Sequence, residues 1–245
     1  MKKKIITMIA AAAMVFSACA NNEAGQEVNE DVIKIGSIFP LTGQYSNYGQ
    51  STVNGMEIAI DEINEAGGIN GKTIALESLD DKGELTDSVT SYQKLAESGA
   101  QAIVGTSTSS PSLAIAEASL ADGIPVITPT GTEESITEGK ANVFRTCFTN
   151  PYQGELLAIF AKDSLDAKTA AILVNSASDY STGIAESFEK KAAELGIDVV
   201  AKESYGENDT DFKAQLTSIA SEDPDVLLLP EYYEKLSLIA RSEER

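Results

Sequence analysis

Two hydroxyl-rich segments are the best candidates for a binding site in this chain. Residues 107–112 read Ser-Thr-Ser-Ser-Pro-Ser and follow one apolar run, and residues 128–132 read Thr-Pro-Thr-Gly-Thr and follow the next. Hydroxyl groups and the free N–H groups of a helix N-terminus bind carboxylates well. Neither segment carries a base that could activate a hydroxyl, so binding is favoured over catalysis. A well-capped helix, with Ser110 as N-cap and Pro111 at the first helical position, also explains the first segment and is compatible with binding.

Tyrosines could supply the rest of such a site. Tyr45 and Tyr48 follow the first apolar run, Tyr180 follows a later one, and Tyr232 and Tyr233 follow the last. Each tyrosine has an apolar face and a hydroxyl, which suits a small ligand with both characters. A single tyrosine is more often a packing residue, but their agreement across three loops indicates a shared site.

The composition excludes most other chemistry. The 245 residues include no histidine and two cysteines, which excludes histidine-based catalysis, histidine-ligated metals, thiolate zinc sites and iron–sulfur clusters. We expect no catalytic residue, no metal and no cofactor. The net charge of −20 argues against a nucleic-acid partner, because phosphate binding needs a basic surface.

Residues 66–73, Ala-Gly-Gly-Ile-Asn-Gly-Lys-Thr, fit a relaxed phosphate-binding loop. Such a loop requires a strand before it and a helix after it, so that helix-terminal N–H groups face the phosphates. Here a helical pattern through Ile63 comes first and an apolar run follows. We therefore predict a turn in which Gly67 and Gly68 end the helix with positive φ angles.

The elements that position these residues alternate along the chain. Runs of apolar and β-branched residues predict strands, and the stretches between them predict amphipathic helices, one with Leu156, Leu157, Phe160 and Leu165 on its apolar face. The predicted strands are residues 32–39, 73–79, 102–104, 124–128, 169–174, 199–201 and 226–229. This alternation is typical of an α/β fold with parallel sheets, in which ligands bind at the carboxyl ends of the strands.

A division falls near residue 150. Residues 129–142 form a long stretch with glycines and glutamates, a short segment at 143–146 follows, and Asn150-Pro151 starts a new helix. We expect an N-terminal lobe at residues 32–148 and a C-terminal lobe at residues 149–245.

The first residues resemble an export signal. Lysines at positions 2–4 precede an apolar run that is too short to span a bilayer comfortably, and Phe16-Ser17-Ala18-Cys19 resembles a bacterial lipobox. We predict a signal peptide at residues 1–18, lipidation of Cys19 and a flexible tether at residues 19–31. An ordinary secretory peptide is the alternative. Lipidation would leave Cys147 without a partner, so no intrachain disulfide is expected.

Several motifs in order resemble the substrate-binding lipoproteins of branched-chain amino acid ABC transporters, the Leu/Ile/Val-binding type of class I periplasmic binding proteins. The segments are Ile35-Gly36, Pro40-Leu41-Thr42-Gly43, Tyr48-Gly49, residues 66–72, Asp80-Asp81, Ile127-Thr128-Pro129 and Asp179-Tyr180-Ser181-Thr182-Gly183. The resemblance runs from about Val32 to Tyr233. It implies two Rossmann-like lobes, of periplasmic binding protein type 1, that close on a ligand by hinge motion.

The resemblance also implies roles for single residues. Ser109 and Thr132 would hold the ligand α-carboxylate, and the Thr130 position would contribute to the α-ammonium. Tyr48, Tyr180 and Tyr232 would line the pocket or join across it, with Tyr233 as an alternative to Tyr232. Asp80-Asp81 would be structural. The resemblance implies a binding protein, not an enzyme, that passes a small amino acid to an ABC permease. The implied protein is a monomer, anchored by lipid on the extracytoplasmic face of the membrane or in the periplasm.

Two departures from the family leave alternatives open. The acidic residue that neutralises the ligand ammonium in relatives has no counterpart before Tyr233, and the chain ends inside an apparent helix. We therefore expect the second lobe and the hinge to be incomplete in this chain. Ser107-Thr108 stands where some leucine binders have apolar residues, so the preferred side chain is open. Alternatives are the same fold binding amides, urea or other small acids, an extracellular sensing module, and a decayed gene product without function.

Overall fold

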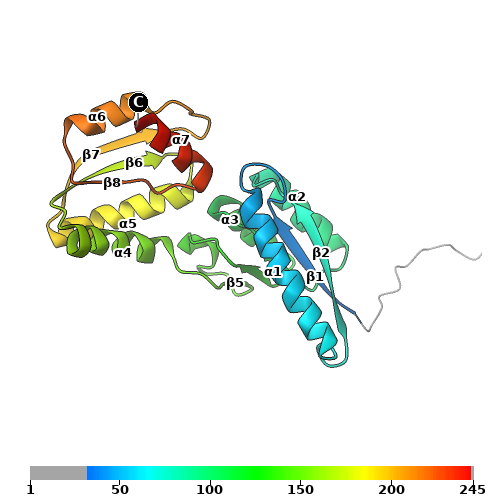
Figure 1. Cartoon of the computed structure of the whole chain (residues 1–245). Helices are drawn as coiled ribbons and strands as arrows, with labels where there is room; N and C mark the ends of the chain where they lie inside the picture. The colour runs from blue at the N-terminus through cyan, green and yellow to red at the C-terminus, as the bar shows by residue number, and fades with distance from the viewer. Residues whose placement is uncertain (1–31, 244–245) are drawn as a thin grey trace, which may run out of the picture. The chain divides into compact units, whose positions relative to one another are not determined.

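The computed structural model describes residues 32–243, and these residues form two parallel sheets (Figure 1). The first sheet has the order β2-β1-β3-β4-β5 and the second the order β7-β6-β8. The strands are β1 (Val32–Phe39), β2 (Thr73–Asp80), β3 (Ala102–Gly105), β4 (Val126–Thr128), β5 (Val143–Arg145), β6 (Thr169–Asn175), β7 (Asp198–Tyr205) and β8 (Val226–Leu228). All pairings between these strands are parallel, which confirms the predicted α/β fold. The predicted signal peptide, Cys19 and the whole of the tether lie outside the described residues.

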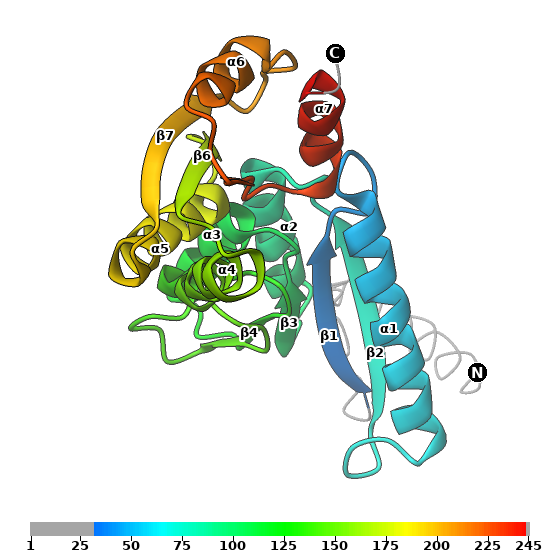
Figure 2. The ribbon, with the colours of Figure 1, turned by 60° about the vertical axis from the view of Figure 1, so that its left-hand side comes forward.

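Helices cover both faces of the first sheet. α1 (Ser46–Glu65) lies along β1 and β2, while α2 (Leu85–Glu97) and α3 (Ser109–Ser119) cover the other face (Figure 2). This arrangement follows from right-handed crossovers, because the connection from β1 to β2 runs in the opposite direction to the next two. Buried side chains under α2 and α3 form a core that includes Tyr92, Leu95, Ile103, Ile115 and Val126.

The second sheet separates two apolar layers. On β6, Ala170, Ile172 and Val174 belong to the core under α4 (Asn150–Leu165) and α5 (Asp179–Leu195). The alternate residues Ala171 and Leu173 belong to the core under α6 (Lys213–Ser221) and α7 (Tyr233–Glu243). Because successive side chains of a strand point to opposite faces, a continuous apolar run can serve both layers.

The observed strands follow the predicted runs, and β7 differs most. It extends to Tyr205, whereas the sequence predicted residues 199–201 only. β7 stands at an edge of the sheet order, and its second half alternates polar and buried positions. A search for apolar runs therefore ends too early on such a strand.

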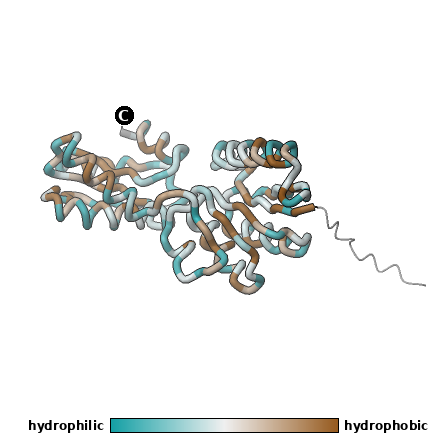
Figure 3. Tube along the Cα trace, turned by 90° about the horizontal axis from the view of Figure 1, so that it is seen from below, coloured by the Kyte–Doolittle hydropathy of each residue, from teal (hydrophilic) through white to brown (hydrophobic). Residues whose placement is uncertain are grey.

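Of the apolar face predicted for α4, Leu157 packs against the core, whereas Leu156, Phe160 and Leu165 are exposed. Leu156 is 49% exposed and Phe160 is 52% exposed. After Asn150, the buried positions of α4 are instead small residues, Gly154, Ala158 and Ala161. Figure 3 shows the hydropathy of each described residue along the Cα trace, with apolar and polar segments interspersed. Small residues let α4 approach α5 closely, so packing distance decides which face is buried. No helix in residues 32–243 is both long enough and apolar enough to cross a membrane.

The segment that resembles a phosphate-binding loop is a turn, as predicted. Gly67 has a φ of 102° and Gly68 a φ of 73°. Their N–H groups donate to Asn64 O at 3.0 Å and Ile63 O at 2.9 Å, which closes the last turn of α1 before β2 begins.

Asp80 and Asp81 fix the turn after β2. The Asp80 carboxylate accepts hydrogen bonds from the N–H groups of Leu41 at 2.8 Å and Lys82 at 2.9 Å, and from the Thr42 hydroxyl at 2.5 Å. Burial alone would raise the pKa of Asp80, but these hydrogen bonds lower it on balance. Burial raises the pKa of Asp81, which accepts from Gly83 N–H at 2.9 Å.

We expect Asp80→Asn to lower the unfolding free energy by about 1 kcal/mol at pH 7, because it weakens charge-assisted hydrogen bonds in a partly solvated turn. The folded-state pKa of Asp80 lies below the unfolded value of about 4, so this stabilisation is present above that pH and is lost as pH falls through the folded pKa. Urea unfolding of wild type and variant should differ at pH 7 and converge toward pH 3. A stability difference between wild type and Asp80→Asn that stays the same at every pH would contradict the stabilising role of the Asp80 carboxylate.

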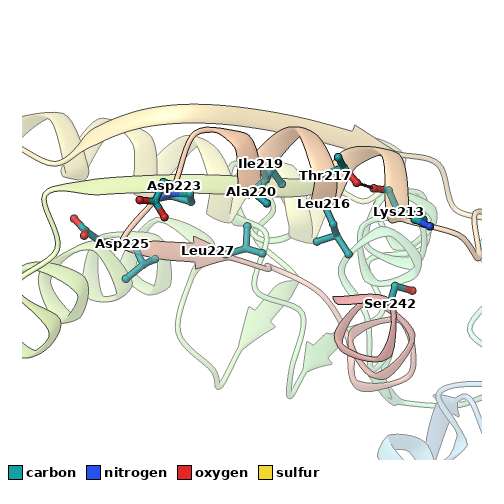
Figure 4. Close-up of a pocket in the computed structure, with 11 residues that line it drawn as sticks. Lys213, Leu216, Thr217, Ile219, Ala220, Asp223, Asp225, Leu227 and Ser242 are labelled. Atoms are coloured by element: carbon teal, nitrogen blue, oxygen red, sulfur yellow. Dashed lines mark hydrogen bonds between the residues drawn. The ribbon is translucent and has the colours of Figure 1, made fainter. Parts of the chain in front are cut away.

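A cavity of about 560 Å³ lies between α6, β8 and Ser242 of α7 (Figure 4). Leu216 and Ile219 from α6 and Leu227 from β8 contribute apolar walls. β8 pairs with β6 and has no second partner among residues 32–243. None of the residues predicted to bind a ligand lines this cavity, so it is not the candidate site.

Candidate functional site

Two hydroxyls face each other beyond the carboxyl ends of β3 and β4. These strands are adjacent and parallel, with Ile103 opposite Val126, so their following loops leave the same edge of the sheet. Ser109 Oγ lies 3.5 Å from Thr132 Oγ1, and the two residues are 2% and 6% exposed. The two hydroxyl-rich loops therefore lie side by side, and hydroxyls from both are within reach of one small group.

A deeper layer of hydroxyls holds these loops in place. Thr128 Oγ1 accepts the Gly131 N–H at 2.8 Å and lies 3.2 Å from Ser112 Oγ, which lies 3.1 Å from Thr106 Oγ1. A Cβ atom on Gly131 would stand 2.7 Å from Thr128 Oγ1 and 2.8 Å from Ser112 Oγ. Only glycine fits between them, and the loop backbone is thereby fixed before any ligand arrives.

The Thr130 hydroxyl is used within the protein. Its Oγ1 donates to the backbone carbonyl of Ser107 at 2.8 Å, which ties the second loop to the first. A contribution of Thr130 to a ligand ammonium would therefore come from its backbone carbonyl.

The helix after β3 begins earlier than predicted. Thr108 is the N-cap and Ser109 the first residue of α3, so Ser110 is not the cap and Pro111 is not the first helical residue. The Ser109 N–H consequently belongs to the first turn, whose N–H groups have no partner within the helix. The shift places the Ser109 hydroxyl and its own N–H at the same helix terminus.

Tyr232 is the centre of a tyrosine cluster. Its ring stacks on Tyr180, with centroids 4.7 Å apart and planes 14° apart. It makes edge contacts with Tyr45 at 5.2 Å and Tyr48 at 6.3 Å. Tyr233 contacts Tyr48 instead and donates its hydroxyl to Gln44 O at 2.5 Å. These contacts favour Tyr232 over Tyr233 as the residue nearest the hydroxyl loops.

Tyr48, Tyr180 and Tyr233 lie on helices, not in loops as predicted, and Tyr233 is the first residue of α7. Tyr48 is in the first turn of α1 and Tyr180 in the first turn of α5. Both helices start at the carboxyl ends of strands, so the tyrosines still reach the same region. Helical placement restricts their rotamers and holds the rings in fixed positions.

A cavity of about 220 Å³ is lined by two of the six predicted binding residues, Ser109 and Tyr232, whereas Thr130, Thr132, Tyr48 and Tyr180 are not among its lining residues. Its walls come from segments that follow strands β1, β2, β3, β6, β7 and β8. The lining residues are Gln44, Tyr45, Gly83, Glu84, Leu85, Thr108, Ser109, Ser110, Pro111, Ala177, Ser178, Glu207 and Tyr232. They include no lysine or arginine but two glutamates, Glu84 and Glu207, so a carboxylate here would depend on the neutral donors at the Ser109 end of the cavity.

The sequence reasoning missed two carboxylates near this cavity. Asn175 Nδ2 donates to Glu207 at 2.8 Å and to Glu231 at 3.2 Å, and the Tyr205 hydroxyl donates to Glu231. Glu207 follows the true end of β7, and extending the alternation of that strand to Tyr205 would have located it. Among the described residues, no three Cys, Asp or Glu side chains are grouped so as to hold a metal ion.

The cluster tyrosines are neutral hydrogen-bond donors at physiological pH. Burial is the main cause that raises the pKa of Tyr232; the neighbouring Tyr180 raises it further, and the Ser109 N–H lowers it. Burial, followed by Glu207 and Glu231, raises the pKa of Tyr45. Tyr232 and Ser109 both line the 220 Å³ cavity, so the neutral Tyr232 hydroxyl and the start of α3 belong to the same wall.

Direct hydrogen bonds join the hydroxyl-rich loops of the first sheet to the starts of α4 and α5. Ser110 Oγ donates to the Asp179 carboxylate at the start of α5 at 2.8 Å. Asn150 Nδ2, at the start of α4, donates to Glu133 Oε2 at 2.8 Å and to Asp179 O at 3.3 Å. These contacts bring the helix termini after β3, β5 and β6 to one place.

Known proteins share this arrangement. The sequence model of the periplasmic binding protein family matches residues 32–231. The Leu/Ile/Val-binding protein BraC3 of Rhizobium johnstonii is 34% identical over 98% of this chain and 63% of its own length. The leucine binding protein LivK of Thermotoga maritima is 33% identical with a TM-score of 0.82, over 86% of this chain and 60% of that one.

The branched-chain amino acid transporter substrate binding protein LivJ of Streptococcus pneumoniae, solved in complex with isoleucine, is 33% identical with a TM-score of 0.81, over 87% of this chain and 61% of that one. The chain thus spans 60% to 63% of the length of these relatives. Because the family model covers most of the chain and both sheets, this protein belongs to the periplasmic binding protein family.

Proposed function

We propose that this protein is an extracytoplasmic solute-binding protein that captures a small α-amino acid and delivers it, as a monomer, to an ABC permease. Membership of the periplasmic binding protein family supports this proposal. The relatives described above are named for leucine, isoleucine and valine, which makes branched-chain amino acids the first candidates. Catalysis is not part of the proposal, because neither hydroxyl loop contains a base.

The pair of facing hydroxyls carries the proposal. Ser109 and Thr132 are buried, 3.5 Å apart, and belong to two loops that a deeper hydroxyl layer fixes. The N-terminus of α3 adds N–H groups and the positive end of its dipole. A carboxylate, with its several acceptor positions, is the group that this set of neutral donors suits best.

In this proposal the other predicted residues contact the parts of the ligand away from its carboxylate. Tyr48, Tyr180 and Tyr232 line it, and Thr130 contributes its carbonyl to the ammonium. We assign residues 32–148 and 149–245 to two lobes that close around the ligand by hinge motion. The stacking of Tyr180 on Tyr232 and the edge contact with Tyr48 support a role for these rings in closure.

A thermal-unfolding panel on residues 20–245 tests the function. We expect an L-amino acid present at about a hundred times its dissociation constant to add roughly 2.7 kcal/mol of stability, which is a visible rise in the midpoint. Isothermal titration would then give the affinity. If small amides, urea or other carboxylic acids raise the midpoint and no amino acid does, the ligand class is one of these compounds and the fold assignment is unaffected. A cooperative transition that no compound moves would reject the proposal.

We further propose that Cys19 is lipidated and holds the protein on the extracytoplasmic face of the membrane. The basic head, the short apolar run and the Ser17-Ala18-Cys19 ending support it. We expect Cys19→Ser to remove incorporation of a labelled fatty acid and to move the protein from the membrane fraction to the soluble extracytoplasmic fraction. Cys147→Ser is the control and should keep the label. Unchanged labelling in Cys19→Ser would place the lipid on another residue, and absence of label from the wild-type protein would leave only an ordinary secretory signal.

A further inference from the structure

Among the described residues, two buried side-chain polar atoms lack a hydrogen-bond partner, Ser107 Oγ and Asn150 Oδ1, and of these two residues only Ser107 belongs to a hydroxyl-rich loop. Ser107 is 7% exposed, and its Oγ has no hydrogen-bond partner and almost no contact with solvent. Its neighbours differ: Thr106 and Ser112 share hydrogen bonds, and the Thr130 hydroxyl is donated to the Ser107 carbonyl. A buried hydroxyl without a partner is rare and unfavourable, so a specific group is expected to satisfy it in the working state.

The backbone places Ser107 on the same side of the chain as Ser109, although Ser107 itself is not among the residues that line the 220 Å³ cavity. Thr108 is extended, with φ −115° and ψ 159°. In extended backbone the side chains of residues i and i+2 lie on the same side, so Ser107 lies on the side of Ser109. Ser109 lines the 220 Å³ cavity and faces Thr132. Ser107 is therefore the next side chain on the same side of the backbone as Ser109, one of the two residues of the carboxylate-binding pair.

We propose that Ser107 selects a ligand whose side chain carries a hydrogen-bonding group close to Cα, such as threonine or asparagine, over the apolar amino acid of the same shape. The inference rests on the proposed amino-acid-binding function and specifies its substrate class. A polar side chain satisfies the Ser107 Oγ, whereas an apolar one leaves it buried and unpaired. Sites built to bond a hydroxyl discriminate strongly against the analogue that lacks it.

Isosteric pairs test this selectivity. Threonine against valine, and asparagine against leucine, differ in polarity with nearly unchanged shape. We expect calorimetric titration of the wild-type chain to give a polar-over-apolar preference of about tenfold or more for at least one pair, the effect of one satisfied buried group. Ser107→Ala should reduce that ratio to near one, mainly by weakening the polar ligand.

Ser119→Ala is the matched control, because Ser119 is a fully buried serine on α3 whose hydroxyl already donates to Ala116 O at 2.7 Å. It should leave the ratio unchanged. The unliganded Ser107→Ala protein should melt at or above the wild-type midpoint, since an unpaired hydroxyl is removed. Tighter binding of the apolar member in both pairs, with a ratio that Ser107→Ala does not alter, overturns the inference and assigns the hydroxyl to a water molecule. Absence of binding by every amino acid overturns the proposed function together with it.

Discussion

Replacing Gly154 by valine is expected to destabilise the protein by about 3 kcal/mol or more, and replacing it by alanine by about 1 to 3 kcal/mol. A Cβ atom on Gly154 would stand 2.7 Å from both Ile184 O and Ser187 Cβ and 2.9 Å from Phe188 N. Two of these atoms are backbone atoms of α5, which no rotamer change can move aside. The two helices would have to separate, and the core of Ala158, Ala185 and Phe188 between them would loosen.

Urea unfolding followed by circular dichroism measures this effect. Gly55→Ala is the control, because Gly55 lies in α1 with no atom within 4 Å of its added Cβ. The control should be neutral or more stable by about 0.4 to 1 kcal/mol, through the helix propensity of alanine and the lower entropy of the unfolded chain. Equal stability of Gly154→Val and wild type would show that the α4–α5 packing is looser than described.

Elements that bury apolar residues on both faces could be predicted from the sequence with good bounds. β1 was predicted at its observed limits, Val32–Phe39, because five of its eight residues are large and apolar and they reach both of its ends. The turn at Gly67 and Gly68 was equally accessible, since positive φ angles after a helix favour glycine. Local chemistry determined these features, and no distant contact changed them.

Features that depend on distant partners were missed. Periodicity alone selected Leu156 and Phe160 as the packing face of α4, but the closeness of α5 requires small residues there, and the large ones are exposed. The carboxyl end of β7 was also misplaced, because a search for apolar runs ends too early on an edge strand, and Glu207 was missed with it. For α4 a partner in space decides the outcome, and no window of the sequence contains it.

The candidate site shows the same limit. The juxtaposition of Ser109 and Thr132 could be inferred, because parallel neighbouring strands bring their following loops together. The choice between Tyr232 and Tyr233 could not, because it depends on where α7 starts and on the ring of Tyr180. The use of the Thr130 hydroxyl as a tie to Ser107 could not be inferred either.

Ser109→Asp is expected to abolish ligand binding while leaving the fold intact. The introduced carboxylate would take the position proposed for the ligand carboxylate, and like charges in contact oppose binding by several kcal/mol, about a hundredfold or more in affinity. An acidic residue at the start of α3 also interacts favourably with the helix dipole, by about 0.3 to 1 kcal/mol, which offsets part of the cost of burying the carboxylate, and a cooperative urea transition should show that the fold is retained. Ser109→Ala removes one neutral donor only and should weaken binding roughly 2- to 10-fold.

The amino acid that gives the largest thermal shift serves as the ligand, and calorimetric titration gives the affinities. Thr90→Asp, on the exposed surface of α2, makes the same change in net charge and controls for long-range repulsion. We expect the affinity order wild type, Thr90→Asp, Ser109→Ala, Ser109→Asp, with the first two equal within error because solvent and salt screen distant surface charges. If Ser109→Asp binds as tightly as Ser109→Ala, no carboxylate occupies this helix terminus, and the facing hydroxyls bind a neutral group. The gap between the two Ser109 variants therefore reports the charge of the ligand group there, independently of which side chain the ligand carries.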